Sequence, residues 1–314
     1  MKKNRALEIL KNISKVLVTL GALYWVIRNI RNNKDISLEE LENELMNCDW
    51  TILFLAFCAY AASQLMASWR LNSFFKVIKL NLTERYNFRL YQLGLLYNFF
   101  LPGGIGGDGY KIYFLKKEHH VRGRKILSAV FFDRLSGLWA LCIITCALII
   151  FMPRLAIPNY ITISAALLGT LSYYFILHTY FKDFSKKFFI THIKALGVQG
   201  FQVLSAILIL YSLDFQDKFS PYLLLFLVSS LVSIVPSIGG GAGLRELVMM
   251  YGAMYLKIDI HSALLLSIFF YVISLLMASS GIYYVIRPER LGAKKLPSVA
   301  EVEEEIVKEK EDYD

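Results

Sequence analysis

The sequence predicts an all-α polytopic membrane protein with six full spans, two re-entrant helical hairpins and an inverted-topology repeat. Of its 314 residues, 56% are hydrophobic, and the mean hydropathy is +0.48. This composition is too apolar for one soluble domain of this length. Two related Gly-rich motifs, each of which interrupts an apolar stretch, indicate the repeat, because paired interruptions in two halves of a membrane protein point to a transport site.

Six apolar stretches approach the ~20 residues that a helix needs to cross a bilayer. They lie at about residues 14–30, 50–71, 126–151, 157–181, 195–213 and 261–286. Two further stretches, 88–115 and 221–256, are broken in the middle by Gly and Pro. Because each half is too short to span alone, we expect each broken stretch to enter the membrane, turn and leave on the same side, where protein or a water-filled cavity surrounds its irregular backbone.

The two breaks carry the same motif. Residues 102–111 read PGGIGGDGYK, and residues 236–245 read PSIGGGAGLR. Counted from each proline, positions +4, +5 and +7 are glycine in both copies, and position +9 is basic. The shared residues are Gly106, Gly107, Gly109 and Lys111 in the first copy, and Gly240, Gly241, Gly243 and Arg245 in the second.

The charged residues set the orientation. The net charge of +9 comes from basic residues in short loops, which is typical of membrane orientation rather than of nucleic-acid binding. If each broken stretch begins and ends on the same side of the membrane, all strongly basic loops fall on one face. In this assignment Arg70 belongs to the basic loop after the second span. This assignment predicts a membrane domain at 1–290 with repeats at about 50–151 and 195–286, an acidic cytoplasmic tail at 291–314, and both termini in the cytoplasm of a prokaryotic inner membrane.

The glycines and the cations after them are candidate substrate-binding groups. An unwound Gly-rich stretch exposes backbone N–H groups, although glycine also permits tight helix packing. Lys111 and Arg245 fall in the first turn after each break, where a helix N-terminus plus a cation suits a lipid phosphate. An internal ion pair with Asp108, Glu246 or Asp133 is an equal alternative for each cation.

Three carboxylates and one further arginine complete the candidate site. We expect Asp108 to cap the second half of its hairpin, and Glu246 to occupy a first turn or to neutralise Lys111 or Arg134. Asp133 and Arg134 are adjacent in a predicted span, so we expect them to pair with other helices, with Asp133 a candidate proton-coupling group. The four cysteines read as small apolar side chains, and the sequence predicts no metal site and no cofactor.

In this order, the motifs resemble those of a known family. Residues 101–108 (LPGGIGGD), 132–135 (FDRL) and 236–246 (PSIGGGAGLRE) are similar to the transmembrane domain of lysylphosphatidylglycerol synthetase/flippase proteins, and the pairs Asp49-Trp50 and Trp69-Arg70 also match. The resemblance covers roughly residues 10–290. It implies an inner-membrane lipid translocator of the stand-alone kind, without the soluble aminoacyltransferase domain.

The predicted function is therefore a flippase that moves a phospholipid or lipid-linked headgroup. Its expected partner is a membrane lipid and not a nucleic acid; a second copy of the chain and a separate lipid-modifying enzyme are candidate partners. The alternative is a membrane-embedded transferase acting on a lipid-linked substrate, with Asp108, Asp133 or Glu246 as acid and base groups. A structural membrane subunit is a third interpretation, which the paired broken helices disfavour.

Overall fold

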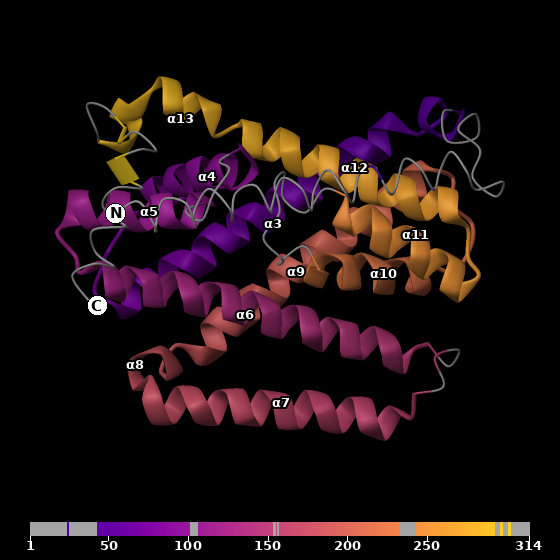
Figure 1. Ribbon diagram of the computed structural model, residues 1–314, viewed down its shortest axis with the longest axis horizontal. Helices are drawn as coiled ribbons and strands as arrows, with labels where there is room; N and C mark the ends of the chain where they lie inside the picture. Colours follow the sequence, from indigo (N-terminus) through magenta and orange to yellow (C-terminus); the bar gives the residue numbers. More distant parts are fainter. Residues whose placement is uncertain are drawn as a thin grey trace.

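The computed structural model describes residues 24, 43–100, 106–152, 155, 157–232, 243–292, 296–297 and 301–302, which form helices and connecting turns without a β-strand. Figure 1 shows their arrangement. The helices are α3 (Trp50–Val77), α4 (Glu84–Phe100), α5 (Gly106–His119), α6 (Gly123–Ile150), α7 (Asn159–Tyr180), α8 (Lys182–Ser185), α9 (Phe188–Ser212), α10 (Phe219–Val232), α11 (Leu244–Leu256), α12 (Ile260–Ser279), α13 (Ile282–Ile286) and the 3-10 turn η2 (Pro288–Leu291).

Five helical segments of the described residues are long and apolar enough to cross a membrane: α3, α6, α7, α9 and the continuous α12–α13 segment. They confirm five of the six predicted spans; the sixth, 14–30, lies outside the described residues except for Tyr24. Two boundaries differ from the prediction, because α3 continues to Val77 and α9 already begins at Phe188. Both extensions carry polar residues. They fit a helix that continues past the apolar core of the bilayer into the headgroup region.

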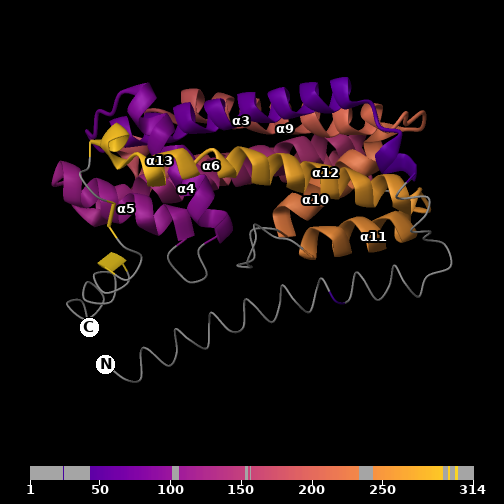
Figure 2. The same ribbon diagram turned by 90° about the horizontal axis from the view of Figure 1, so that it is seen from above.

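Both broken stretches form pairs of short helices. The helices α4 and α5 have 17 and 14 residues, and α10 and α11 have 14 and 13. At 1.5 Å per residue none reaches the ~30 Å of a bilayer core. Within each pair the two helices pack against each other. Figure 2 shows the α4–α5 pair and the α10–α11 pair at opposite ends of the long helices.

The long helices form the frame around these pairs. The most extensive helix contact joins α3 and α9, which lie side by side in both views (Figures 1 and 2). The helix α7 lies at the edge, against α6. Apolar side chains of α7 such as Leu168 and Phe175 are more than 60% exposed, as expected for a helix that faces lipid.

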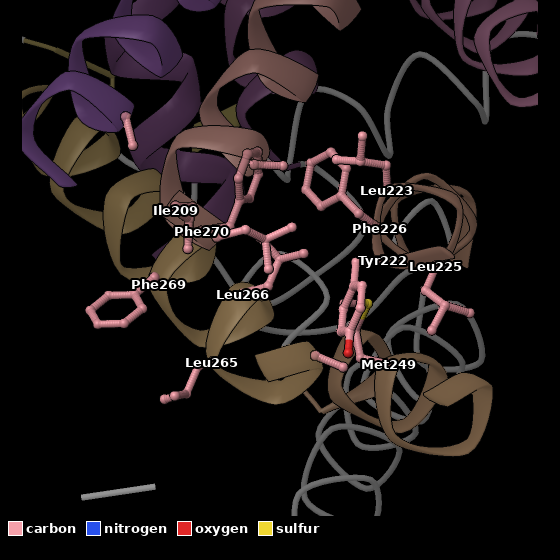
Figure 3. Close-up of a cluster of buried hydrophobic side chains, with 14 of the residues drawn as sticks. Ile209, Tyr222, Leu223, Leu225, Phe226, Met249, Leu265, Leu266, Phe269 and Phe270 are labelled. Carbon is pink, nitrogen blue, oxygen red and sulfur yellow. The ribbon is translucent and has the colours of Figure 1, made fainter. Parts of the chain in front are cut away.

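A large apolar cluster joins α9, α10, α11 and α12, and Figure 3 shows part of it. Phe226 of α10 and Phe270 of α12 pack there edge to face, with ring centroids 4.6 Å apart. Ile209 and Tyr222 are buried beside them. This cluster fixes the position of α11, whose first turn carries a residue of the candidate site.

Candidate functional site

A cavity of about 470 Å³ lies where the two halves of the chain meet. Helices from both predicted repeats contribute to its wall, including the ends of α4 and α10 and the start of α11. Each of seven helices contributes at least one lining residue: Tyr60 of α3, Phe99 of α4, Arg134 of α6, Gln199 of α9, Ser230 of α10, Arg245 of α11 and Tyr271 of α12. The cavity therefore lies beside the ends of α4 and α10 and the start of α11.

Arg245 is the buried cation of this cavity. It is 6% exposed, and its guanidinium carbon lies 4.9 Å from the ring centroid of Phe270 and 5.8 Å from that of Phe226. Its Nε and Nη2 have no hydrogen-bond partner among the described residues. The aromatic faces offset part of the cost of burying the charge. Unsatisfied buried donors still cost about 1–3 kcal/mol each, and more when charged, so these nitrogens are suited to an anion.

Glu246 is bound within its own half of the chain. One carboxylate oxygen accepts a hydrogen bond from the backbone N–H of Gly243 at 2.6 Å, and the other accepts one from the Ser267 hydroxyl at 2.8 Å. Gly243 has φ of +84°, a conformation that favours glycine. Of the two alternatives for Glu246, the position in the first turn of its helix is confirmed. Neutralisation of Lys111 or Arg134 was wrong, because Gly243 at the start of α11 and Ser267 of α12 bind both oxygens.

Lys111 is paired, unlike its counterpart Arg245. Its ammonium nitrogen lies 2.7 Å from one oxygen of Asp108 and 5.2 Å from the ring centroid of Tyr91. The other oxygen of Asp108 accepts a hydrogen bond from Arg134 of α6. Asp108 lies inside α5, two residues after its start, and bridges two cations. It does not cap the helix as expected, since within the described part of the chain its oxygens bind side chains only.

Asp133 pairs with Arg70 of α3. The Arg70 Nε lies 2.8 Å from one carboxylate oxygen, and Nη2 lies 3.1 Å from the other. Asp133 and Arg134 thus pair with different helices, as predicted. Placing Arg70 in a basic loop was wrong, because it is 7% exposed within α3. The signal in the sequence is ambiguous, because Arg70 falls near the end of an apolar stretch, where a basic residue can lie either in a loop or in a helix with a buried partner.

Glycine is required at two positions of the first Gly-rich motif, for backbone conformation at Gly106 and for helix packing at Gly107. Gly106 has φ of +50°. A Cβ added to Gly107 would lie 1.8 Å from the carbonyl oxygen of Gly94, so only glycine lets α4 and α5 approach this closely. The N–H of Gly107 donates to the Asn98 side chain at 2.7 Å. Gly109 lies in the same turn of α5, whereas Gly240 and Gly241 lie outside the described residues.

The sequence of the membrane helices identifies the family. The model of the lysylphosphatidylglycerol synthase transmembrane region matches residues 12–281. The chain belongs to this family. No curated protein matches the chain. Membership in the lysylphosphatidylglycerol synthase transmembrane-region family and the five span-length helices make the chain a multi-pass membrane protein with a function related to membrane lipids.

Proposed function

We propose that this protein is a flippase that moves a phospholipid or lipid-linked headgroup across a prokaryotic cytoplasmic membrane. The observation that carries the proposal is the cavity of about 470 Å³, which both halves of the chain line. Arg245 is part of its wall, and the buried Nε and Nη2 of this residue have no hydrogen-bond partner among the described residues. Transport folds built from inverted repeats place their substrate site at such an interface between broken helices.

Helix contacts support an inverted repeat in which α3–α6 correspond to α9–α12. The helix α6 packs against α10, and its counterpart α12 packs against α4. The contact of α5 with α6 corresponds to that of α11 with α12. The contact of α3 with α6 corresponds to that of α9 with α12. An exchange of the two halves therefore maps these contacts onto each other. In this account the two short-helix pairs are re-entrant hairpins that enter from opposite faces.

Charge supports the orientation of the hairpins. The junction of α5 and α6, from the last turn of α5 to the first turn of α6, carries basic residues that favour the cytoplasmic face: Lys116, Lys117, Arg122, Arg124 and Lys125. The corresponding segment after α11 carries only Lys257, followed by Asp259. The α4–α5 hairpin is therefore open to the cytoplasm in the proposed topology, and the α10–α11 hairpin to the outside.

The cavity also has an exposed apolar side. Phe131 of α6 lines it and is 56% exposed, and the neighbouring Arg134 side chain is 60% exposed. A lipid needs such an edge, because its acyl chains stay in the bilayer while its headgroup occupies the cavity. Rocking of one repeat against the other would then expose the headgroup to each face in turn.

The described residues provide little for the transferase alternative. Asp108 and Asp133 are bound to cations and Glu246 to two donors, and none of the three lines the cavity. A general acid or base has to reach the reacting group, with a pKa suited to proton transfer. Carboxylates held in this way are better placed to fix helices than to move protons.

Movement of fluorescent phospholipids in proteoliposomes tests the proposal. Leu138 lines the cavity, so Leu138→Trp should fill part of it and slow lipid movement at least tenfold. The matched control is Leu168→Trp on the exposed face of α7, which should move lipid at the wild-type rate. The proposal fails if the wild-type protein moves no lipid, or if both variants move lipid equally well.

A further inference from the structure

The charges around the cavity do not balance. Two of its lining residues are cations, Arg134 and Arg245. Arg134 shares the single carboxylate of Asp108 with Lys111, so this trio carries one excess positive charge. The pair of Arg70 and Asp133 is neutral. Glu246 offsets the charge of Arg245, but its oxygens bind Gly243 and Ser267 and not the guanidinium.

The connecting segments do not change this balance, because residues 101–105 and 233–242 contain no charged side chain. Among the described residues, the group of four cations and three carboxylates around the cavity thus retains one positive charge. An uncompensated charge at membrane depth is costly and calls for a counter-ion. A ligand with one negative charge would supply it.

The hydrogen-bonding residues around the cavity further restrict the chemical class of the ligand. Arg245 offers two unpartnered nitrogens, and the amide oxygen of Gln199, a residue that is 8% exposed, also has no partner among the described residues. The wall further contains Gln202, Tyr271 and Ser274. Donors on a cation suit the oxygens of a phosphodiester, and an unpartnered amide oxygen suits a hydroxyl donor.

We infer that the cavity selects a lipid with a monoanionic phosphodiester and a hydroxylated, uncharged headgroup, and that Arg245 is the residue that binds its phosphate. This inference deepens the proposed function, on which it rests. A lipid whose headgroup carries an additional amine, such as an aminoacyl ester of phosphatidylglycerol, fits less well. Its ammonium groups would need a carboxylate, and within the described lining no Asp or Glu is present.

Equilibrium binding to the purified full-length protein tests the inference. The probes are phosphatidylglycerol, its lysyl ester, and phosphatidylmethanol, which has the same phosphodiester charge but no hydroxyl in its headgroup. Deacylated glycerophosphoglycerol distinguishes a lipid from a soluble phosphodiester. We expect phosphatidylglycerol to bind roughly tenfold more tightly than each of the other three.

Arg245→Gln should weaken binding of phosphatidylglycerol roughly tenfold or more, because a charge-assisted hydrogen bond is lost. Arg245→Lys retains the charge without the fork of donors and should give an intermediate loss. Gln199→Leu should abolish the preference for phosphatidylglycerol over phosphatidylmethanol. The matched control is Arg287→Gln, where the arginine side chain is 62% exposed, and this variant should bind as the wild type does.

The inference is overturned if the lysyl ester binds as tightly as phosphatidylglycerol, if the deacylated probe does so, or if Arg245→Gln and Arg287→Gln bind equally. Thermal unfolding of each variant separates a binding defect from misfolding, and Arg245→Lys and Gln199→Leu keep the test open if Arg245→Gln does not fold. If the protein moves lipid without this selectivity, the inference on the ligand is refuted and the proposed flippase function stands. If it binds phosphatidylglycerol selectively but moves no lipid, the inference on the ligand stands and the proposed flippase function is refuted.

Discussion

The guanidinium of Arg70 in α3 binds both carboxylate oxygens of Asp133 in α6, with N–O distances of 2.8 and 3.1 Å. The two side chains are only 9% and 12% exposed. A Cβ added to Gly137 would lie 3.1 Å from the same guanidinium, so the small residue leaves space for it. This pair joins two span-length helices of the first half of the chain.

Asp133→Leu should lower the free energy of unfolding by about 3–5 kcal/mol, because it leaves the Arg70 charge buried without a partner. The double variant Arg70→Met/Asp133→Leu should recover most of this loss, since apolar side chains can fill the same volume. Chemical or thermal unfolding in detergent measures both effects.

The pair of Lys76 and Glu84 is the control for this comparison. It has the same short N–O distance of 2.8 Å, but its side chains are 48% and 44% exposed. Its removal by Lys76→Met should cost less than about 1 kcal/mol. Equal losses for the two pairs, or a double variant as unstable as Asp133→Leu, would contradict the structural role of Arg70.

Gly107→Ala should separate the two helices of the first hairpin. The new methyl group would meet the backbone oxygen of Gly94, which cannot turn aside as a side chain can. We expect a loss of at least about 1–3 kcal/mol of unfolding free energy. Gly169→Ala in α7 is the control, because nothing lies within 4 Å of its added Cβ, and it should stabilise the helix by up to about 1 kcal/mol. A Gly107→Ala protein as stable as the Gly169→Ala protein would refute the close contact.

Asp259, which caps α12, should make stability depend on pH. Burial acts to raise its pKa, but hydrogen bonds from the backbone and side chain of Ser262 outweigh it, so the pKa lies below the ordinary value of 3.8. Because the pKa is lower in the folded state, the stabilisation is complete above about pH 4 and disappears as the pH falls through the folded-state pKa.

Asp259→Asn retains a capping group without the charge. The wild type should be more stable than this variant near pH 7, by about 0.3–1 kcal/mol. The side chain is 42% exposed, which favours the lower end of this range. The difference should vanish near pH 2, and a difference that is constant from pH 7 to pH 2 would exclude the carboxylate as its cause.

Much of the fold could be predicted from the sequence because bilayer thickness sets the length of apolar stretches. Five spans were predicted in this way. The division of two further stretches into pairs of short helices was predicted from their Gly and Pro residues. Arg70 was not, because a basic residue near the end of an apolar stretch has the same pattern whether it lies in a loop or inside a longer helix. Its burial depends on Asp133, 63 residues further along the chain.

Lys111 forms an ion pair with a carboxylate of its own helix and Arg245 does not, and this difference follows in part from the spacing of charged residues in the sequence. Asp108 and Lys111 are three residues apart, so they share one face of a helix and can pair. Arg245 and Glu246 are adjacent, so their side chains point in different directions, and Glu246 turns to the N-terminus of its helix. The sequence could suggest this contrast, but the aromatic faces around Arg245 come from α10 and α12 and depend on the tertiary structure.

The opposite orientation of the two hairpins is the central claim, and cysteine labelling tests it most directly. The four native cysteines would be replaced by alanine, and one new cysteine placed at His120, after α5, or at Lys257, after α11; both positions are exposed. A membrane-impermeant maleimide should modify His120→Cys only from the cytoplasmic face and Lys257→Cys only from the outer face. Modification of both from the same face would contradict the inverted repeat and the transport site built on it.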